Sequence, residues 1–272
     1  MRARFEIWVI MVLTIAATII YAFSDGSEWE INGFKLRKLN VNGLADSSEK
    51  ESQKQPEDNN SIKNSVDSTR QRIMLFGDSM TEGLFYSLDD YCQENGHTLY
   101  SATWYSATTE SFAKSNILDT YIRLYHPTYF IICLGSNELF VKDLTERKRY
   151  IQDILKKLGN RPYVWISPPN WTKDTGMDSI IRQTVGVKRF FNSSDLTLKR
   201  SDDHIHPTVE ASAQWMKHIA GWMQSTGKTA HPILMRDPTR SFKHRFTDYY
   251  QTDFKEFNGN DNPERHRHFF RQ

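Results

Sequence analysis

Five short apolar runs that alternate with segments of helical periodicity constrain the fold of this 272-residue chain. The runs cover residues 72–76, 98–103, 129–134, 163–167 and the short pair 190–191. Strands of this length separated by helices are typical of a parallel sheet that helices cover on both faces. The alternation therefore predicts an α/β domain with a central parallel sheet of about five strands.

Helical spacing of apolar residues supports the same interpretation between the runs. It is clearest after the first and third runs and again near the end of the domain, where Met216, Ile219 and Met223 mark a last helix. Pro207 suits a first helical turn, so we expect this helix to begin near Pro207. Parallel strands with helical crossovers place their carboxyl ends at one edge of the sheet, where ligands bind in open α/β folds.

A serine follows the first run directly, in the segment Gly77-Asp78-Ser79-Met80-Thr81-Glu82-Gly83. A turn from strand to helix at this point lifts the Ser79 hydroxyl to the carboxyl edge of the sheet. The free N–H groups of the helix start then face any oxyanion that forms there. The sequence predicts a nucleophile at Ser79, although an ordinary helix-capping serine is the simpler alternative.

A serine nucleophile needs a base and an acid that orients the base. Asp203 and His206 stand three residues apart in a D-x-x-H-P segment, which lets Asp203 accept a hydrogen bond from one imidazole nitrogen while the other points at Ser79. Asn137 follows the third run, and its amide is the candidate oxyanion donor.

These three blocks, in this order, resemble the SGNH (GDSL-type) hydrolase superfamily over about residues 71–225. The resemblance implies a three-layer, flavodoxin-like fold. It assigns Ser79 as the nucleophile, His206 as the base and Asp203 as its partner. The N–H groups of Ser79 and Ser106 and the amide of Asn137 would form the oxyanion hole, and no cofactor is implied. Ser106 stands where the family usually has glycine, so its backbone conformation is in question.

Two further sets of residues have competing interpretations. His204 and His206, beside Asp202 and Asp203, could ligate zinc, but no second cluster of ligands stands out, and we expect no metal. Trp104, Tyr105 and Trp171 lie just past expected strand ends. They either offer aromatic faces to a substrate or close the top of the core.

The resemblance implies a serine esterase that hydrolyses carboxylic esters through an acyl-enzyme, with an acetylated polysaccharide as the favoured substrate. An O-acetyltransferase of a cell-surface glycan would use the same three residues, with a membrane acyltransferase as a possible partner that supplies the acetyl group. A non-catalytic, membrane-anchored scaffold is the alternative from another functional class.

The N-terminus carries a separate signal. Arg2 and Arg4 precede an uncharged apolar run over residues 7–23, about the minimum length that spans a bilayer. Residues 1–24 are therefore predicted to be an uncleaved signal-anchor that leaves the catalytic domain on the periplasmic side of the cell membrane. A cleavable signal peptide, with small residues near position 22, is the alternative.

The remaining boundaries follow from composition. Residues 25–70 are expected to form a juxtamembrane stretch, in which 29–44 could be a short hairpin, followed by a polar linker. The hydrolase domain is expected over 71–226 and a partly disordered tail over 227–272, which prolines interrupt. The 35 basic and 33 acidic residues are dispersed, which argues against a nucleic-acid partner.

Overall fold

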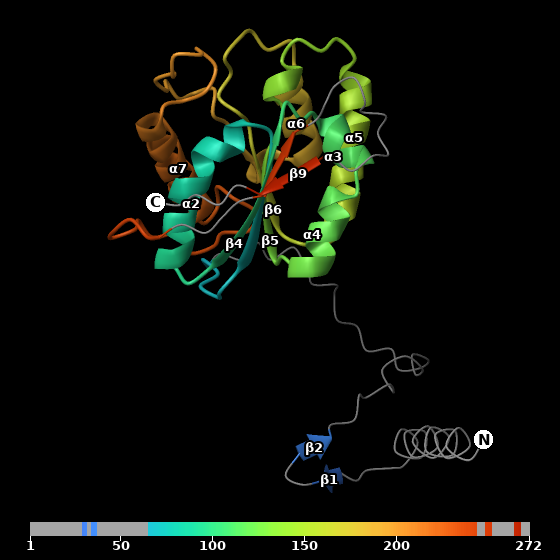
Figure 1. Cartoon of the computed structure of the whole chain (residues 1–272), viewed down its shortest axis with the longest axis vertical. Helices are drawn as coiled ribbons and strands as arrows, with labels where there is room; N and C mark the ends of the chain where they lie inside the picture. Colours follow the sequence, from blue (N-terminus) through green and yellow to red (C-terminus); the bar gives the residue numbers. More distant parts are fainter. Residues whose placement is uncertain (1–28, 32–33, 37–64, 244–247, 252–263, 268–272) are drawn as a thin grey trace, which may run out of the picture. The chain divides into compact units, whose positions relative to one another are not determined.

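The computed structural model describes residues 29–31, 34–36, 65–243, 248–251 and 264–267 (Figure 1). The chain divides into two compact units, residues 1–57 and 58–272. In the first, strand β1 (Trp29–Ile31) pairs antiparallel with β2 (Phe34–Leu36), so this stretch contains the short hairpin that was one of its two expected forms. The predicted signal-anchor lies outside the described residues. None of the helices in the described ranges is long and apolar enough to cross a membrane.

The second unit is built on a sheet whose strands lie in the order β7-β6-β5-β3-β4-β8-β9. The five strands from the predicted runs are all parallel to their neighbours. They are β3 (Arg72–Gly77), β4 (Thr98–Tyr105), β5 (Tyr129–Cys133), β6 (Tyr163–Ile166) and β7 (Phe190–Phe191). Numbered along the chain, these five have the spatial order 2-1-3-4-5, which is the flavodoxin-like arrangement. The predicted fold class is confirmed.

Helices cover both faces of this sheet, which makes three layers (Figure 1). One face packs against α2 (Met80–Glu94) and α7 (Val209–Met223). The other face packs against four helices: α3 (Thr109–Lys114), α4 (Ile117–Tyr125), α5 (Leu144–Leu158) and α6 (Met177–Val185). Short 3-10 helices, η1 (Ser136–Glu138) and η2 (Val187–Arg189), follow β5 and α6.

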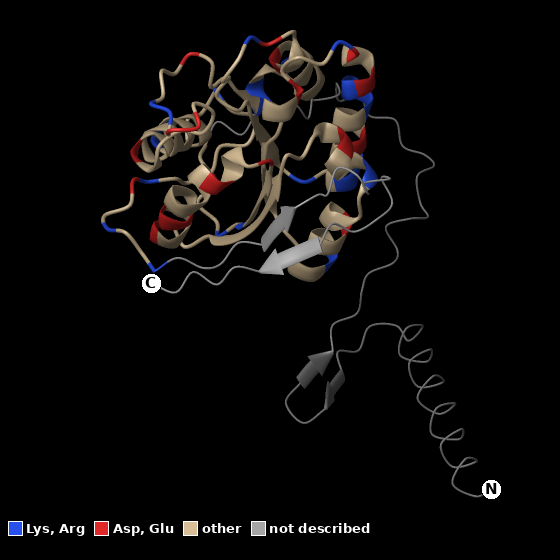
Figure 2. Ribbon diagram, turned by 45° about the horizontal axis from the view of Figure 1, so that its top comes forward, with Lys and Arg blue, Asp and Glu red and all other residues tan. Residues whose placement is uncertain are grey.

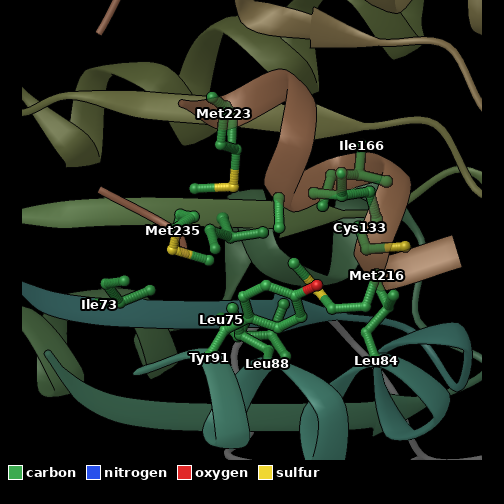
Figure 3. Close-up of a cluster of buried hydrophobic side chains, with 14 of the residues drawn as sticks. Ile73, Leu75, Leu84, Leu88, Tyr91, Cys133, Ile166, Met216, Met223 and Met235 are labelled. Atoms are coloured by element: carbon green, nitrogen blue, oxygen red, sulfur yellow. The ribbon is translucent and has the colours of Figure 1, made fainter. Parts of the chain in front are cut away.

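Alternate strand residues divide the core between the two faces. Leu75 of β3 lies in the cluster with α2 and α7, while its neighbours Met74 and Phe76 lie in the cluster on the opposite face. Figure 3 shows the first cluster, where Leu84 of α2 lies close to Met216 of α7. The outward face of α5 is charged with both signs interleaved (Figure 2).

The domain extends past the boundary expected at residue 226. Ile233 and Met235 are buried in the core, and the Asn95 side chain accepts a hydrogen bond from the backbone N–H of Arg236 at 3.0 Å. Farther along, β8 (Asp248–Gln251) pairs parallel with β4, and β9 (Glu264–Arg267) pairs antiparallel with β8. The tail is therefore partly built into the sheet, because its apolar residues fill the core and β8 occupies the edge of β4.

The last helix begins near Pro207, as expected. Helix α7 starts at Val209, and Thr208 caps it by accepting a hydrogen bond from the N–H of Ala211 at 3.2 Å. Pro207 thus lies one residue before the cap. Thr208 takes the cap position because its hydroxyl accepts a hydrogen bond from a free N–H at the helix start, and a proline side chain has no acceptor. His206 still lies just before the helix.

Gly77 lets β3 and β5 approach each other where β3 ends. A Cβ atom at this position would lie 1.8 Å from the carbonyl oxygen of Cys133 in β5 and 2.7 Å from the Thr81 side chain. The same carbonyl accepts a hydrogen bond from the N–H of Asp78 at 3.1 Å, so backbone on both sides fixes the gap. Only glycine fits here without moving one of the two strand ends.

We expect Gly77→Ala to lower the free energy of unfolding by about 3 kcal/mol, because the added methyl group must push the strand ends apart. Gly221→Ala in α7 is the matched control, since its Cβ would meet nothing within 4 Å. That change should raise stability by about 0.5–1 kcal/mol through helix propensity. Urea denaturation of both variants tests the comparison, and equal effects would contradict it.

Candidate active site

Ser79 stands at the turn between β3 and α2, as the sequence predicts. Its φ of −58° and ψ of −22° are already helical, and it is the residue before the first of α2. Asp78 holds this turn, because its Oδ1 accepts a hydrogen bond from the N–H of Met80 at 3.0 Å. The Ser79 hydroxyl is thereby fixed at the carboxyl edge of the sheet, where it is only half-buried.

The D-x-x-H segment forms a tight hairpin at the same edge. The N–H of Ser201 donates to the carbonyl of His206 at 2.8 Å, and the N–H of Thr208 donates to the carbonyl of Lys199 at 2.9 Å. Asp203, at the tip, accepts hydrogen bonds on Oδ1 from the backbone N–H groups of Ile205 and His206 at 2.8 and 2.9 Å. These bonds fix the carboxylate relative to the imidazole.

The structure brings Ser79, His206 and Asp203 together in one chain of hydrogen bonds. His206 Nδ1 lies 2.6 Å from Asp203 Oδ2, and His206 Nε2 lies 2.8 Å from Ser79 Oγ. The hydrogen bond from the His206 side chain, with the two backbone N–H groups, holds the pKa of Asp203 well below its usual range. An ionised Asp203 requires the proton on Nδ1, which leaves Nε2 free to accept the Ser79 proton.

Asn137 lies in η1, directly after β5, and its amide is held in place. Its Nδ2 donates to the backbone carbonyl of Ala107 at 2.9 Å. An amide nitrogen carries two hydrogens, so this bond fixes the amide plane and leaves a second donor. Because β3 and β5 are neighbours, Ser79 and Asn137 follow adjacent strands at the point where the strand order reverses.

Ser106, the residue after β4, adopts a left-handed backbone conformation with φ of 61°. This is the conformation that a glycine would favour, and the family resemblance places a glycine at this position. Its side chain is exposed, so the serine disturbs no packing. The backbone at Ser106 therefore takes up the glycine-type turn, with a conformational cost of about 1 kcal/mol.

Two buried carboxylates join the loops that carry these residues. The first is Asp78, whose Oδ2 accepts hydrogen bonds from the hydroxyl and the N–H of Ser136 at 2.7 and 3.3 Å. Burial raises the pKa of Asp78 to about 6, against the opposing effect of these bonds. Asp78 thus connects the turn of Ser79 to the loop of Asn137.

The second buried carboxylate is Glu138, which connects the Asn137 loop to the start of α3. It accepts hydrogen bonds from the N–H and hydroxyl of Thr109 at 2.7 and 2.8 Å and from Arg147 of α5 at 3.1 Å. Burial raises the pKa of Glu138 despite these partners. Asp78 and Glu138 are neighbours of Ser79 and Asn137 in the sequence, but no sequence pattern indicated that they are buried or that they connect loops.

The aromatic residues proposed as a substrate platform have different positions. Trp104 is fully buried and packs edge-on against Phe112, which corrects its assignment to the substrate surface. Tyr105 is half-buried, and its hydroxyl donates to Glu82 Oε2 at 2.8 Å. Trp171 is half-buried, and its Nε1 donates to the carbonyl of Ser136 at 3.0 Å. Only Tyr105 and Trp171 remain candidates for contact with a substrate.

The alternative of a metal site finds no geometric support in the described part of the chain. His204 is exposed, with φ of 60° in the hairpin turn, and does not join His206 in a ligand cluster. Within the described ranges, no group of three or more His, Cys, Asp or Glu side chains is placed to hold a metal ion.

Comparison with solved structures found distant structural neighbours. No family model and no curated protein matches the chain. An aryl esterase from M. smegmatis has a TM-score of 0.45 and 14% identity, covering 56% of this chain and 99% of its own. A carbohydrate acetylesterase family member from Sinorhizobium meliloti has a TM-score of 0.43 and 13% identity, covering 54% and 94%. A carbohydrate esterase family 3 protein from Talaromyces cellulolyticus has a TM-score of 0.42 and 14% identity, covering 55% and 96%.

If the backbone at Ser106 is strained as its φ indicates, Ser106→Gly should be more stable to unfolding than Ser106→Ala by about 1 kcal/mol. Both changes remove the exposed hydroxyl, so their difference isolates the backbone conformation. Thermal unfolding of the two variants measures it. An alanine variant as stable as the glycine variant would show that Ser106 is not held at positive φ.

Proposed function

We propose that this chain is a serine hydrolase that cleaves carboxylic esters through an acyl-enzyme. The single observation that carries the proposal is the continuous hydrogen-bond chain from Asp203 through His206 to Ser79. This arrangement makes a serine hydroxyl a nucleophile by giving it a base whose tautomer is already correct. An ordinary helix-capping serine would not need a histidine and an aspartate aligned behind it.

In the proposed first step, Ser79 Oγ attacks the ester carbonyl while His206 Nε2 takes its proton. The charge on His206 is stabilised by the ionised Asp203, which stays fixed by its backbone hydrogen bonds. The oxyanion lies against the N–H groups of Ser79 and Ser106 and the second amide hydrogen of Asn137. Since these donors belong to loops that buried carboxylates hold together, they need little rearrangement in the transition state.

In the second step, the intermediate collapses and His206 gives its proton to the departing alcohol. The acyl group is then bound to Ser79 Oγ as an ester. Water enters, His206 removes its proton, and hydroxide attacks the acyl carbon at the same oxyanion site. Collapse releases the carboxylic acid and returns the proton to Ser79. The proposed cycle combines one water molecule with side chains and backbone groups of this chain.

We further propose that the substrate is an acetyl ester, carried on a polysaccharide. The order of the G-D-S, G-x-N and D-x-x-H-P blocks supports this choice, because the family that it resembles includes exported enzymes that act on acetylated glycans. The half-buried Tyr105 and Trp171 supply aromatic surfaces of the kind on which sugar rings rest.

Ser79→Ala should abolish the release of acetate from p-nitrophenyl acetate and from acetylated xylan without loss of the fold, because a hydroxyl at the sheet edge contributes little to packing. Activity below about one per cent of the parent is expected, since His206 and the oxyanion donors have no nucleophile to serve.

Ser194→Ala is the control, because Ser194 is exposed and its hydroxyl donates to Asn192 in its own loop. It should keep the parent rate. A Ser79→Ala variant that kept its activity would refute the serine mechanism. Acetylated glycan in place of free acetate, when an acetyl donor and a glycan are supplied together, would make the chain an O-acetyltransferase.

We also propose that the N-terminal segment anchors the enzyme in the membrane with its catalytic domain on the periplasmic side. The Arg2/Arg4 flank, the apolar run and the polar linker support this topology. Fractionation of cells that carry a C-terminally tagged chain should find the full-length protein in the membrane pellet, accessible to protease in spheroplasts. Soluble, N-terminally shortened protein would instead indicate a cleaved signal peptide, and resistance to protease would contradict the orientation.

A further inference from the structure

Arg200, at the base of the D-x-x-H hairpin, contacts two loops at once. Its Nη1 donates to the carbonyl of Ile205 at 2.6 Å, and its Nη2 donates to the carbonyls of Pro169 and Asn170 at 3.2 and 3.0 Å. Ile205 immediately precedes His206 in the chain. Pro169 and Asn170 follow β6 and immediately precede Trp171. One guanidinium group therefore joins the loop of the base to the loop of Trp171.

Trp171 makes the next connection toward Ser79. Its indole N–H donates to the carbonyl of Ser136, and Ser136 in turn donates its hydroxyl to Asp78, the neighbour of the nucleophile. His206 contacts Ser79 from the other side. Together with Ser79 these contacts form a closed ring, which we call the clamp: Asp78, Ser136, Trp171, Arg200 and the hairpin that carries His206.

The chemistry of the clamp requires arginine at position 200. A planar guanidinium presents donors in several directions and can bond three carbonyls that belong to two loops, whereas a lysine ammonium is a point charge on a flexible stem. Burial lowers the pKa of Arg200, while the charge of Asp203 opposes the shift. Arg200 remains charged, and its hydrogen bonds to the carbonyls offset the loss of hydration.

We propose that Arg200 is a positioning residue for the reaction, and this inference rests on the proposed ester hydrolysis. It holds the backbone directly before His206 against the loop of Trp171 and so keeps Nε2 within hydrogen-bond reach of Ser79. A displaced base loses rate even when the substrate still binds, because proton transfer depends on geometry at the scale of one ångström.

Arg200→Met, which removes all three hydrogen bonds, tests the proposal in the purified full chain. We expect kcat for p-nitrophenyl acetate to fall about tenfold or more, with a smaller change in KM, because binding is affected less than the alignment of the base. Arg200→Lys keeps the positive charge but loses the planar set of N–H donors, and its kcat should fall by a similar factor. Guanidinium chloride, added at a non-denaturing concentration, should restore part of the activity of the methionine variant.

Arg161→Met is the matched control. Arg161 is also half-buried and donates to a carbonyl, that of Leu158 at 2.8 Å, but it lies between α5 and the start of β6 and so at the opposite edge of the sheet. Its kcat should stay within twofold of the parent. The proposal is overturned if kcat of Arg200→Met also stays within twofold of the parent or if Arg200→Lys keeps full activity. It is also overturned if Arg200→Met and Arg161→Met lose kcat equally.

A double-mutant cycle with Trp171→Phe, which removes the indole N–H, tests whether the clamp acts as a unit. The fold decrease in kcat of the double variant should be smaller than the product of the two single decreases, because either change alone already breaks the clamp. Losses that multiply would overturn the shared role. Should Arg200→Met not fold, the lysine variant carries the test.

Ser79→Ala in the same assay distinguishes failure of the proposed ester hydrolysis from failure of the positioning role of Arg200. An inactive alanine variant with an unaffected Arg200→Met variant would leave the proposed function in place and overturn only the positioning role. An active alanine variant would overturn both.

Discussion

The hydrogen bonds of Asp78 across the ends of β3 and β5 are the interaction on which the site depends. One carboxylate oxygen holds the turn of Ser79, and the other holds Ser136 beside Asn137. Gly77 permits this contact because a side chain at this position would collide with the backbone of β5 at Cys133. Because both loops are hydrogen-bonded to one buried carboxylate, Asp78 fixes the position of the nucleophile relative to the loop of the oxyanion amide.

Burial of Asp78 orders the site but lowers the stability of the folded chain at neutral pH, where the carboxylate is ionised. Burial raises the pKa of Asp78 from 3.8 to about 6, so the folded state binds the proton more tightly than the unfolded chain does. Stability contributed by this group is present below about pH 4 and is lost as pH rises toward 6, on the order of 2–3 kcal/mol in all. Asp203 has the opposite sign: its pKa is lowered, so its contribution is lost on acidification. Two neighbouring acids whose pKa values are shifted in opposite directions are typical of a functional site.

The sequence predicted the parts of the fold and site that local pattern determines. Short apolar runs indicated the five parallel strands, and the G-D-S, G-x-N and D-x-x-H-P blocks pointed to Ser79, Asn137, Asp203 and His206, because each of these signals lies within a few consecutive residues. Trp104 was misplaced because β4 continues to Tyr105, two residues beyond the apolar run, and a strand residue faces the core rather than the edge. The pairing of β8 with β4 and the bonds of Arg200 join residues far apart in the chain, so no local pattern predicts them.

Covalent labelling distinguishes a Ser79 nucleophile activated by His206 from every other use of this serine. The full chain would be treated with a fluorophosphonate probe and analysed by intact mass and peptide mapping. We expect one adduct per chain, located on Ser79, and no adduct in a His206→Ala variant under the same conditions. Labelling at another residue, or no labelling of a chain that still releases acetate, would contradict it.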